Sequence, residues 1–147
     1  MTSGGGLRAA VFARAAFCCE YCHIRGWEIE VEHIVPRSPR RRVAVSPSDE
    51  ELNALANLAA ACAHCNRFKG DFVTGEASVF GGEHRLFNPR SDQWEAHFAW
   101  SADYLRILPL NGVGDATIQR LHMNDPMLRR QRELLRRAAL AGGSPWP

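Results

Sequence analysis

Two short stretches, CEYC at residues 19–22 and ACAHCNRFKG at residues 61–70, decide how the rest of this sequence is interpreted. Each contains two cysteines separated by two residues, and residues 23–61 lie between the pairs. A CxxC turn lets two thiolates approach one ion, and four thiolates complete the tetrahedral shell of a structural Zn²⁺. The sequence therefore predicts a zinc site whose ligands are Cys19, Cys22, Cys62 and Cys65.

Three neighbouring residues offer alternative ligands. Cys18 precedes Cys19 and would form a pair with three intervening residues, but the two-residue spacer is more common, so we expect Cys19 to bind. His23 and His64 also lie beside the pairs, although four cysteines already fill the shell. A closed four-sulfur site leaves no position for a reacting water, so its expected role is to join distant segments.

Length and composition are those of an ordinary globular domain. The chain has 147 residues, of which 46% are hydrophobic and 23% charged, so it can bury a core and does not resemble a disordered segment. No apolar run approaches the roughly 18 residues of a membrane span, and the first residues do not resemble a signal peptide. We therefore expect a cytoplasmic protein without a membrane partner, in which reduced cysteines bind metal.

The net charge is only +2, but the basic residues are clustered and Lys69 is the only lysine. Arginine binds phosphate through a planar fork, so these clusters are compatible with nucleic acid, although a solvated surface would look the same. A stripe of apolar residues runs along residues 126–140, and every arginine there is expected to lie outside it. The clusters are Arg37, Arg40, Arg41 and Arg42, and Arg129, Arg130, Arg132, Arg136 and Arg137.

Hydrophobic periodicity and punctuation by proline and glycine predict mixed secondary structure. A strand is expected at 28–35, ended by Pro36, and a short helix begins at the capping-box pattern of Ser48 and Glu51. The pattern predicts further helices at 7–17, 65–73, 115–123 and 126–140, a strand or turn at 57–64, and a hairpin formed by 97–101 and 105–110. Trp94, Phe98 and Trp100 are expected in the core.

The residues between and beside the cysteine pairs suggest hydrolytic chemistry. His33, in the stretch EHIVPRS, can accept a proton near neutral pH, and the carboxylate of Glu32 and the amide of Asn66 are hard oxygen donors of the kind Mg²⁺ prefers. Glu32 and His33 point to opposite faces of an ideal strand, so they can share a site only where the strand ends, twists or bulges.

Four motifs occur here in the order seen in HNH endonucleases: CxxC, EHIVPRS, the Asn57-Leu58 pair and ACxxCNxxKG. Residues 7–73 resemble that family. The resemblance implies an α+β fold with a ββα-metal (His-Me finger) core. It also implies that His33 is the general base, that Asn57 orients it, and that Glu32 and Asn66 hold one catalytic Mg²⁺ or Mn²⁺. Glu32 departs from the more common Asp, and the Pro/Arg-rich loop at 37–48 replaces a more usual Gly-containing segment.

The resulting expectation is a metal-dependent endonuclease that hydrolyses DNA, as a monomer or a homodimer. A nuclease core would span residues 1–80, and residues 81–147 would form an extension packed on it. Phosphate contacts are expected from Arg37, Arg40, Arg41, Arg42, Arg67 and Lys69. Two alternatives are a non-catalytic zinc-stabilised nucleic-acid-binding module and an adaptor that binds proteins through its last helix.

Overall fold

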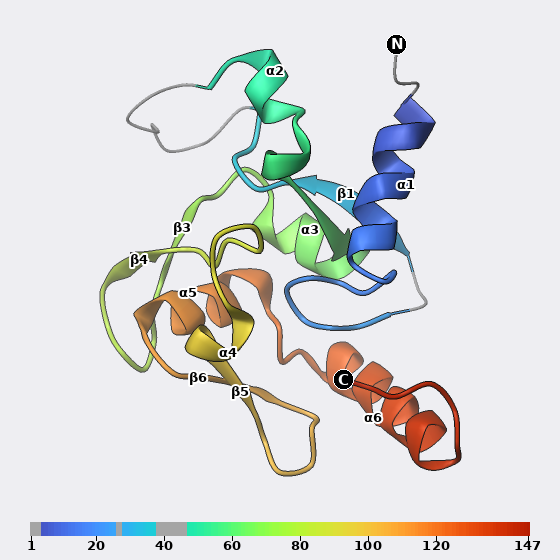
Figure 1. The fold of residues 1–147 in the computed structure, drawn as a ribbon. Coiled ribbons are helices and arrows are strands. Elements are labelled where there is room, and N and C mark those ends of the chain that lie inside the picture. Colours follow the sequence, from blue (N-terminus) through green and yellow to red (C-terminus); the bar gives the residue numbers. More distant parts are fainter. Residues whose placement is uncertain (1–3, 26–27, 38–46) are drawn as a thin grey trace.

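The computed structural model describes residues 4–25, 28–37 and 47–147. The described residues form helices and three two-stranded antiparallel sheets, in the arrangement of Figure 1, so the fold is of the mixed α+β kind. The first helix, α1 (Gly4–Arg14), lies beside the first sheet. Arg40, Arg41 and Arg42, which the sequence analysis assigned to phosphate binding, lie outside the described residues.

The first sheet pairs β1 (Ile29–His33) with β2 (Leu58–Cys62), with Ile29 opposite Cys62 and His33 opposite Leu58. Every residue of β2 is buried, and α3 (Ala63–Lys69) follows it without a connecting loop. The turn into α3 is fixed by the Cys62 sulfur, which accepts a hydrogen bond from the backbone N–H of Cys65. One short unit therefore carries His33 at one end and the second cysteine pair at the other.

The connection from β1 to β2 contains α2 (Asp49–Leu52) and a 3₁₀ turn, η1 (Leu55–Asn57). The expected capping box is present: the Ser48 side chain accepts from the Glu51 N–H, and the Glu51 carboxylate accepts from the Ser48 N–H. This cap determines where α2 begins, and Asn53 is its C-terminal cap. Asn53 and Asn57 both lie close to the end of β1, where they contact His33 and Val35.

The second half contains two hairpins and three helices. The expected hairpin is formed by β5 (Phe98–Trp100) and β6 (Ile107–Pro109). A second hairpin, β3 (Thr74–Glu76) with β4 (Glu83–Arg85), was not anticipated, because we interpreted its glycines as a loop. The helices are α4 (Trp94–His97), α5 (Gly112–Leu121) and α6 (Pro126–Leu140), the last with Pro126 in its first turn as expected.

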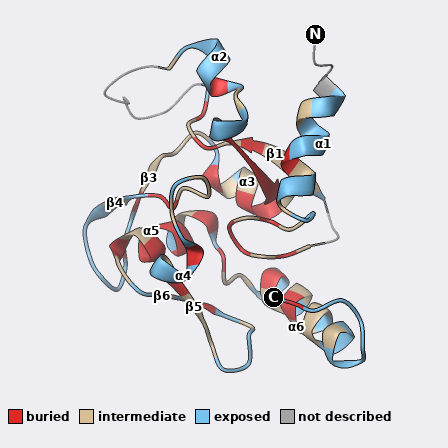
Figure 2. Cartoon of the chain, in the orientation of Figure 1, coloured by how far each residue is buried: buried red, intermediate tan, exposed pale blue. Residues whose placement is uncertain are grey.

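Buried side chains link the two halves of the chain. One hydrophobic cluster includes residues of both cysteine pairs together with Trp94, Phe98 and Leu121. Figure 2 shows β2 and α5 largely buried and α3 buried in part, whereas α1 and α2 are mostly exposed. The two residues Trp94 and Phe98 are thus part of the core, as their aromatic character indicated.

The last helix corrects one expectation. Arg132 is completely buried, whereas Met127 and Leu134, placed on the apolar stripe, are more than 40% exposed. The periodicity analysis assumed that arginines face solvent, but backbone carbonyls accept hydrogen bonds from the Arg132 guanidinium and make its burial possible. In the described part of the chain, no helix has both the length and the apolar character needed to cross a membrane.

Candidate functional site

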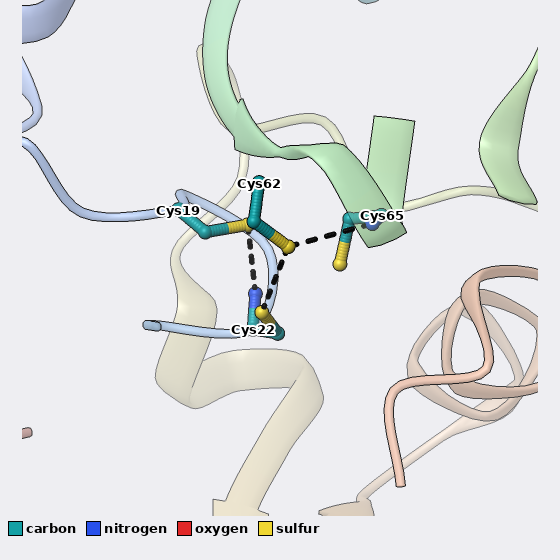
Figure 3. A group of neighbouring side chains, drawn as sticks. All are labelled: Cys19, Cys22, Cys62 and Cys65. Atoms are coloured by element: carbon teal, nitrogen blue, oxygen red, sulfur yellow. Dashed lines mark hydrogen bonds between the residues drawn. The ribbon is translucent and has the colours of Figure 1, made fainter. Parts of the chain in front are cut away.

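The four predicted cysteine ligands meet in one buried cluster. Their sulfur atoms all lie within 4.8 Å of one another, and Figure 3 shows the two pairs facing each other. The Sγ atoms of Cys22 and Cys62 are 3.7 Å apart. A tetrahedral shell with Zn–S bonds of about 2.3 Å has sulfur–sulfur edges of about 3.8 Å, so the spacing fits zinc. Cys18 lies outside this group, which confirms the choice of Cys19.

Two backbone hydrogen bonds stabilise negative charge on the sulfurs of Cys19 and Cys62. The N–H groups of Cys22 and Cys65 point at the sulfurs of Cys19 and Cys62, at 3.5 and 3.4 Å. Side-chain hydrogen bonds from the other three cysteines, with Cys19 foremost, hold the pKa of the Cys62 thiol well below its usual range. His64 is not a member, because its Nε2 lies 3.0 Å from the carbonyl oxygen of His122.

His33 is the last residue of β1, and its partly exposed side chain turns towards α2. Its Nε2 lies 3.1 Å from Oδ1 of Asn53. The Arg37 guanidinium donates to the same Oδ1 at 2.9 Å, and the Asn53 Nδ2 donates to the carbonyl of Asp49 at 2.9 Å. Sequence reasoning missed Asn53, because nothing local to that residue indicates which strand end it will approach.

Asn57, expected to orient His33, contacts the backbone just after it. Its Oδ1 accepts from the Val35 N–H at 2.8 Å, and its Nδ2 donates to the carbonyls of Val35 and Leu52 at 3.0 and 2.9 Å. In addition, the Asn57 carbonyl accepts from the Ile34 N–H at 2.9 Å. Asn57 therefore fixes the course of the chain beyond His33, while Asn53 contacts the imidazole itself.

Glu32 points away from His33, into the space between β1 and α3. It is 2% exposed; its Oε2 accepts from the Tyr21 hydroxyl at 2.7 Å, and its Oε1 lies 2.5 Å from the Lys69 ammonium. Burial, together with the Glu32 carboxylate, raises the pKa of Tyr21 well above its usual value, so the hydroxyl stays a donor. Lys69 also donates to the carbonyls of His33 and Ile34, at 3.2 and 3.0 Å.

The position of Lys69 corrects its predicted role. It is 1% exposed and fully engaged beneath the end of β1, so it does not offer its charge to a phosphate backbone. The sequence analysis expected a phosphate contact because Lys69 lies within one helical turn of Asn66. Arg37 and Arg67, by contrast, are exposed.

Asn66 lies on α3 opposite β1, where its Nδ2 donates to the Glu30 carboxylate at 2.5 Å. The structure thus pairs Asn66 with Glu30, a residue that the sequence analysis did not select. A pocket nevertheless joins the end of β1 to α3, and its lining includes Glu32, His33, Arg37 and Asn66. Carboxylate and amide oxygens on these walls suit a hard divalent cation in kind, although at Glu32 such an ion would meet the Lys69 ammonium.

Fold and site together define a small α+β domain held by a four-cysteine metal site, with a histidine at the end of its first strand. Residues 19–72 match the family model of the HNH endonucleases. Over this stretch the chain is therefore similar to the HNH endonucleases. Neither the curated proteins nor the solved structures include a match to the chain.

Proposed function

We propose that the protein is a metal-dependent endonuclease that hydrolyses phosphodiester bonds of DNA, with His33 as the general base. The observation that carries the proposal is the family match over residues 19–72, a range that includes His33, Asn57 and Asn66. The pocket between β1 and α3 supports it, since His33 and Asn66 line the same hollow. The proposal treats residues 1–80 and 81–147 as one folded unit, in keeping with the shared hydrophobic cluster.

In the proposal, the neighbours of Asn53 select the nitrogen of His33 that acts as the base. Arg37 donates to one end of the Asn53 amide and the Asp49 carbonyl accepts from the other, so Oδ1 must face His33. An oxygen with no proton accepts only, so a neutral His33 carries its proton on Nε2. Nδ1 is then the nitrogen with a free lone pair, and in the proposal it takes the proton of the attacking water.

In the proposal, Glu32 and Asn66 hold the catalytic Mg²⁺ or Mn²⁺. A bound divalent ion stabilises negative charge on the phosphoryl oxygens. Glu30 is the other candidate carboxylate, because it already contacts Asn66. The Lys69 ammonium contributes in a different way, because it binds the carbonyls of His33 and Ile34 and so keeps the strand end in place.

The DNA backbone is the proposed partner, and the exposed guanidinium groups of Arg37 and Arg67 are the proposed phosphate contacts. Arg40, Arg41 and Arg42 belong to the same proposal on their charge alone. Four reduced cysteine ligands require a reducing compartment, which is why the proposal places the protein in the cytoplasm.

The test is nicking of supercoiled plasmid DNA by the full chain with Mg²⁺, with Mn²⁺ and with EDTA, comparing Glu32→Gln and Glu30→Gln with the unchanged protein. Cleavage is expected with either ion and not with EDTA. If Glu32 holds the ion, Glu32→Gln lowers the rate and higher Mg²⁺ partly restores it, because a weakened site still fills by mass action. Glu30→Gln is expected to change the rate less.

Two outcomes would contradict parts of this proposal. If higher Mg²⁺ restored the rate of Glu30→Gln and not that of Glu32→Gln, the ion would be bound by Glu30 and Asn66 instead. Protein that retains zinc and binds DNA but never cleaves it would leave the non-catalytic binding module as the function.

Asn53→Ala is expected to reduce the turnover number by about 10–100-fold, the usual cost of losing a group that orients a functional histidine, with little change in KM. Asn53→Asp keeps an oxygen facing His33 and is expected to retain more activity. The direct measurement is the ¹⁵N NMR spectrum of His33, assigned with His33→Ala. The Nε2–H tautomer should dominate in the unchanged protein and become mixed in Asn53→Ala. An unchanged tautomer in that variant would remove Asn53 from the mechanism.

A further inference from the structure

Arg132 is a buried cation for which the proposed reaction has no use. It lies in α6, one helical turn after Leu128, and both side chains face the interior. Its relative exposure is 0%, although arginine is among the residues least often buried without a partner. Bringing a guanidinium out of water is costly, so its surroundings should supply compensation.

The hydrogen bonds of Arg132 reach only neutral oxygens. Nη2 donates to the carbonyl of Met123 at 2.6 Å, and Nη1 donates to the carbonyl of Leu105 at 3.0 Å and more weakly to Oδ1 of Asn124 at 3.4 Å. The Nε–H has no hydrogen-bond partner among the described residues. None of the ion pairs between described residues includes Arg132.

The anionic neighbour of Arg132 is the cysteine cluster. The Arg132 guanidinium lies 5.7 Å from the centroid of the Trp100 ring, and that ring contacts His23, which directly follows Cys22. Burial lowers the pKa of the guanidinium, and the nearby sulfurs of Cys22, Cys65 and Cys19 raise it. Leu128, on the same face of α6, belongs to the hydrophobic cluster that contains the four ligand cysteines. It also lines a pocket together with Cys62.

With zinc bound, the cysteine cluster has an excess of negative charge, whereas Arg132 has an uncompensated positive charge. One Zn²⁺ held by four thiolates carries a net charge of about −2, and all four ligand residues are buried. A buried charge without a counter-charge costs far more than one that is paired. The N–H groups of the CxxC turns stabilise the sulfurs locally, but neither CxxC turn contains a lysine or an arginine that could compensate the excess charge.

We propose that Arg132 is the counter-charge of the four-cysteine zinc site, so that α6 stabilises the bound metal. The proposal rests on the zinc site and not on the nuclease activity. It also gives the C-terminal extension a role: α6 brings one positive charge to a site whose ligands all lie before residue 66.

The test is the zinc affinity of the full chain, measured under reducing conditions by competition with a chelator of known affinity. Arg132→Met removes the charge and keeps a long side chain, and it is expected to weaken zinc binding by about 10–100-fold, as other losses next to metal ligands do. Arg132→Gln keeps hydrogen-bonding groups without the charge and should lose affinity to a similar extent. Arg132→Lys keeps the charge and should lie close to the unchanged protein.

Arg130→Met is the matched control, because it removes an exposed arginine from the same helix. It should leave zinc affinity unchanged. Equal affinities for Arg132→Lys and Arg132→Gln would overturn the proposal, since charge would then not matter. This comparison still decides the question if Arg132→Met does not fold. The readout is independent of DNA cleavage, so an inactive protein with the expected order of affinities would contradict only the proposed function.

Discussion

Replacing His33 by alanine is expected to lower the rate of DNA cleavage by about 10²–10⁴-fold, the usual cost of losing a general base. The zinc content, fold and DNA affinity should stay unchanged, because the imidazole of His33 is partly exposed, contacts Asn53 and lies away from the cysteine cluster. Raising the Mg²⁺ concentration should not restore the rate, since a missing base is not replaced by a filled metal site. The measurement is the nicking rate as a function of metal concentration.

His84→Ala is the matched control. His84 lies in β4, where its Nε2 contacts the carbonyl of Gly81, and it is not among the residues lining the His33 pocket. Its replacement should leave cleavage unchanged. Metal rescue of His33→Ala would indicate that His33 binds the ion, and undiminished cleavage in that variant would remove the nuclease interpretation of this site.

Replacing Cys62 by serine is expected to abolish tight zinc binding and the cooperative unfolding transition of the domain. Cys62 has two structural roles, as a ligand of the cluster and as the N-terminal cap of α3. Structural zinc contributes on the order of 10 kcal/mol in small zinc domains, which is comparable to the whole stability of a domain. The measurements are the zinc content per chain by elemental analysis and thermal unfolding followed by circular dichroism.

The fifth cysteine provides the control for this experiment. Cys18→Ser should retain zinc and fold, because Cys18 lies outside the cluster and is partly exposed. Removing zinc from the unchanged protein with a chelator should reproduce the effect of Cys62→Ser. A Cys62→Ser protein that keeps one zinc ion and a normal transition would contradict the four-cysteine site.

Local patterns allowed the elements around the site to be predicted well. The capping box at Ser48 and the proline that begins α6 involve residues close in sequence, and each is present in the structure. The strand β1 also forms, although the residue buried in it is the polar Glu32. The hairpin of β3 and β4 was missed, because three-residue strands are too short for a clear alternation and their glycines resemble a loop.

The sequence by itself determined the zinc ligands, since two CxxC turns leave little choice of partner and chelation requires those residue types. It also singled out His33, Asn57 and Asn66 through their order along the chain. Only the tertiary structure decided which groups surround them: Asn53 beside His33, Lys69 beneath Glu32, and Arg132 buried near the cysteines. These pairings depend on contacts between segments distant in sequence, and whether a charge is buried depends on the partners that the fold brings to it.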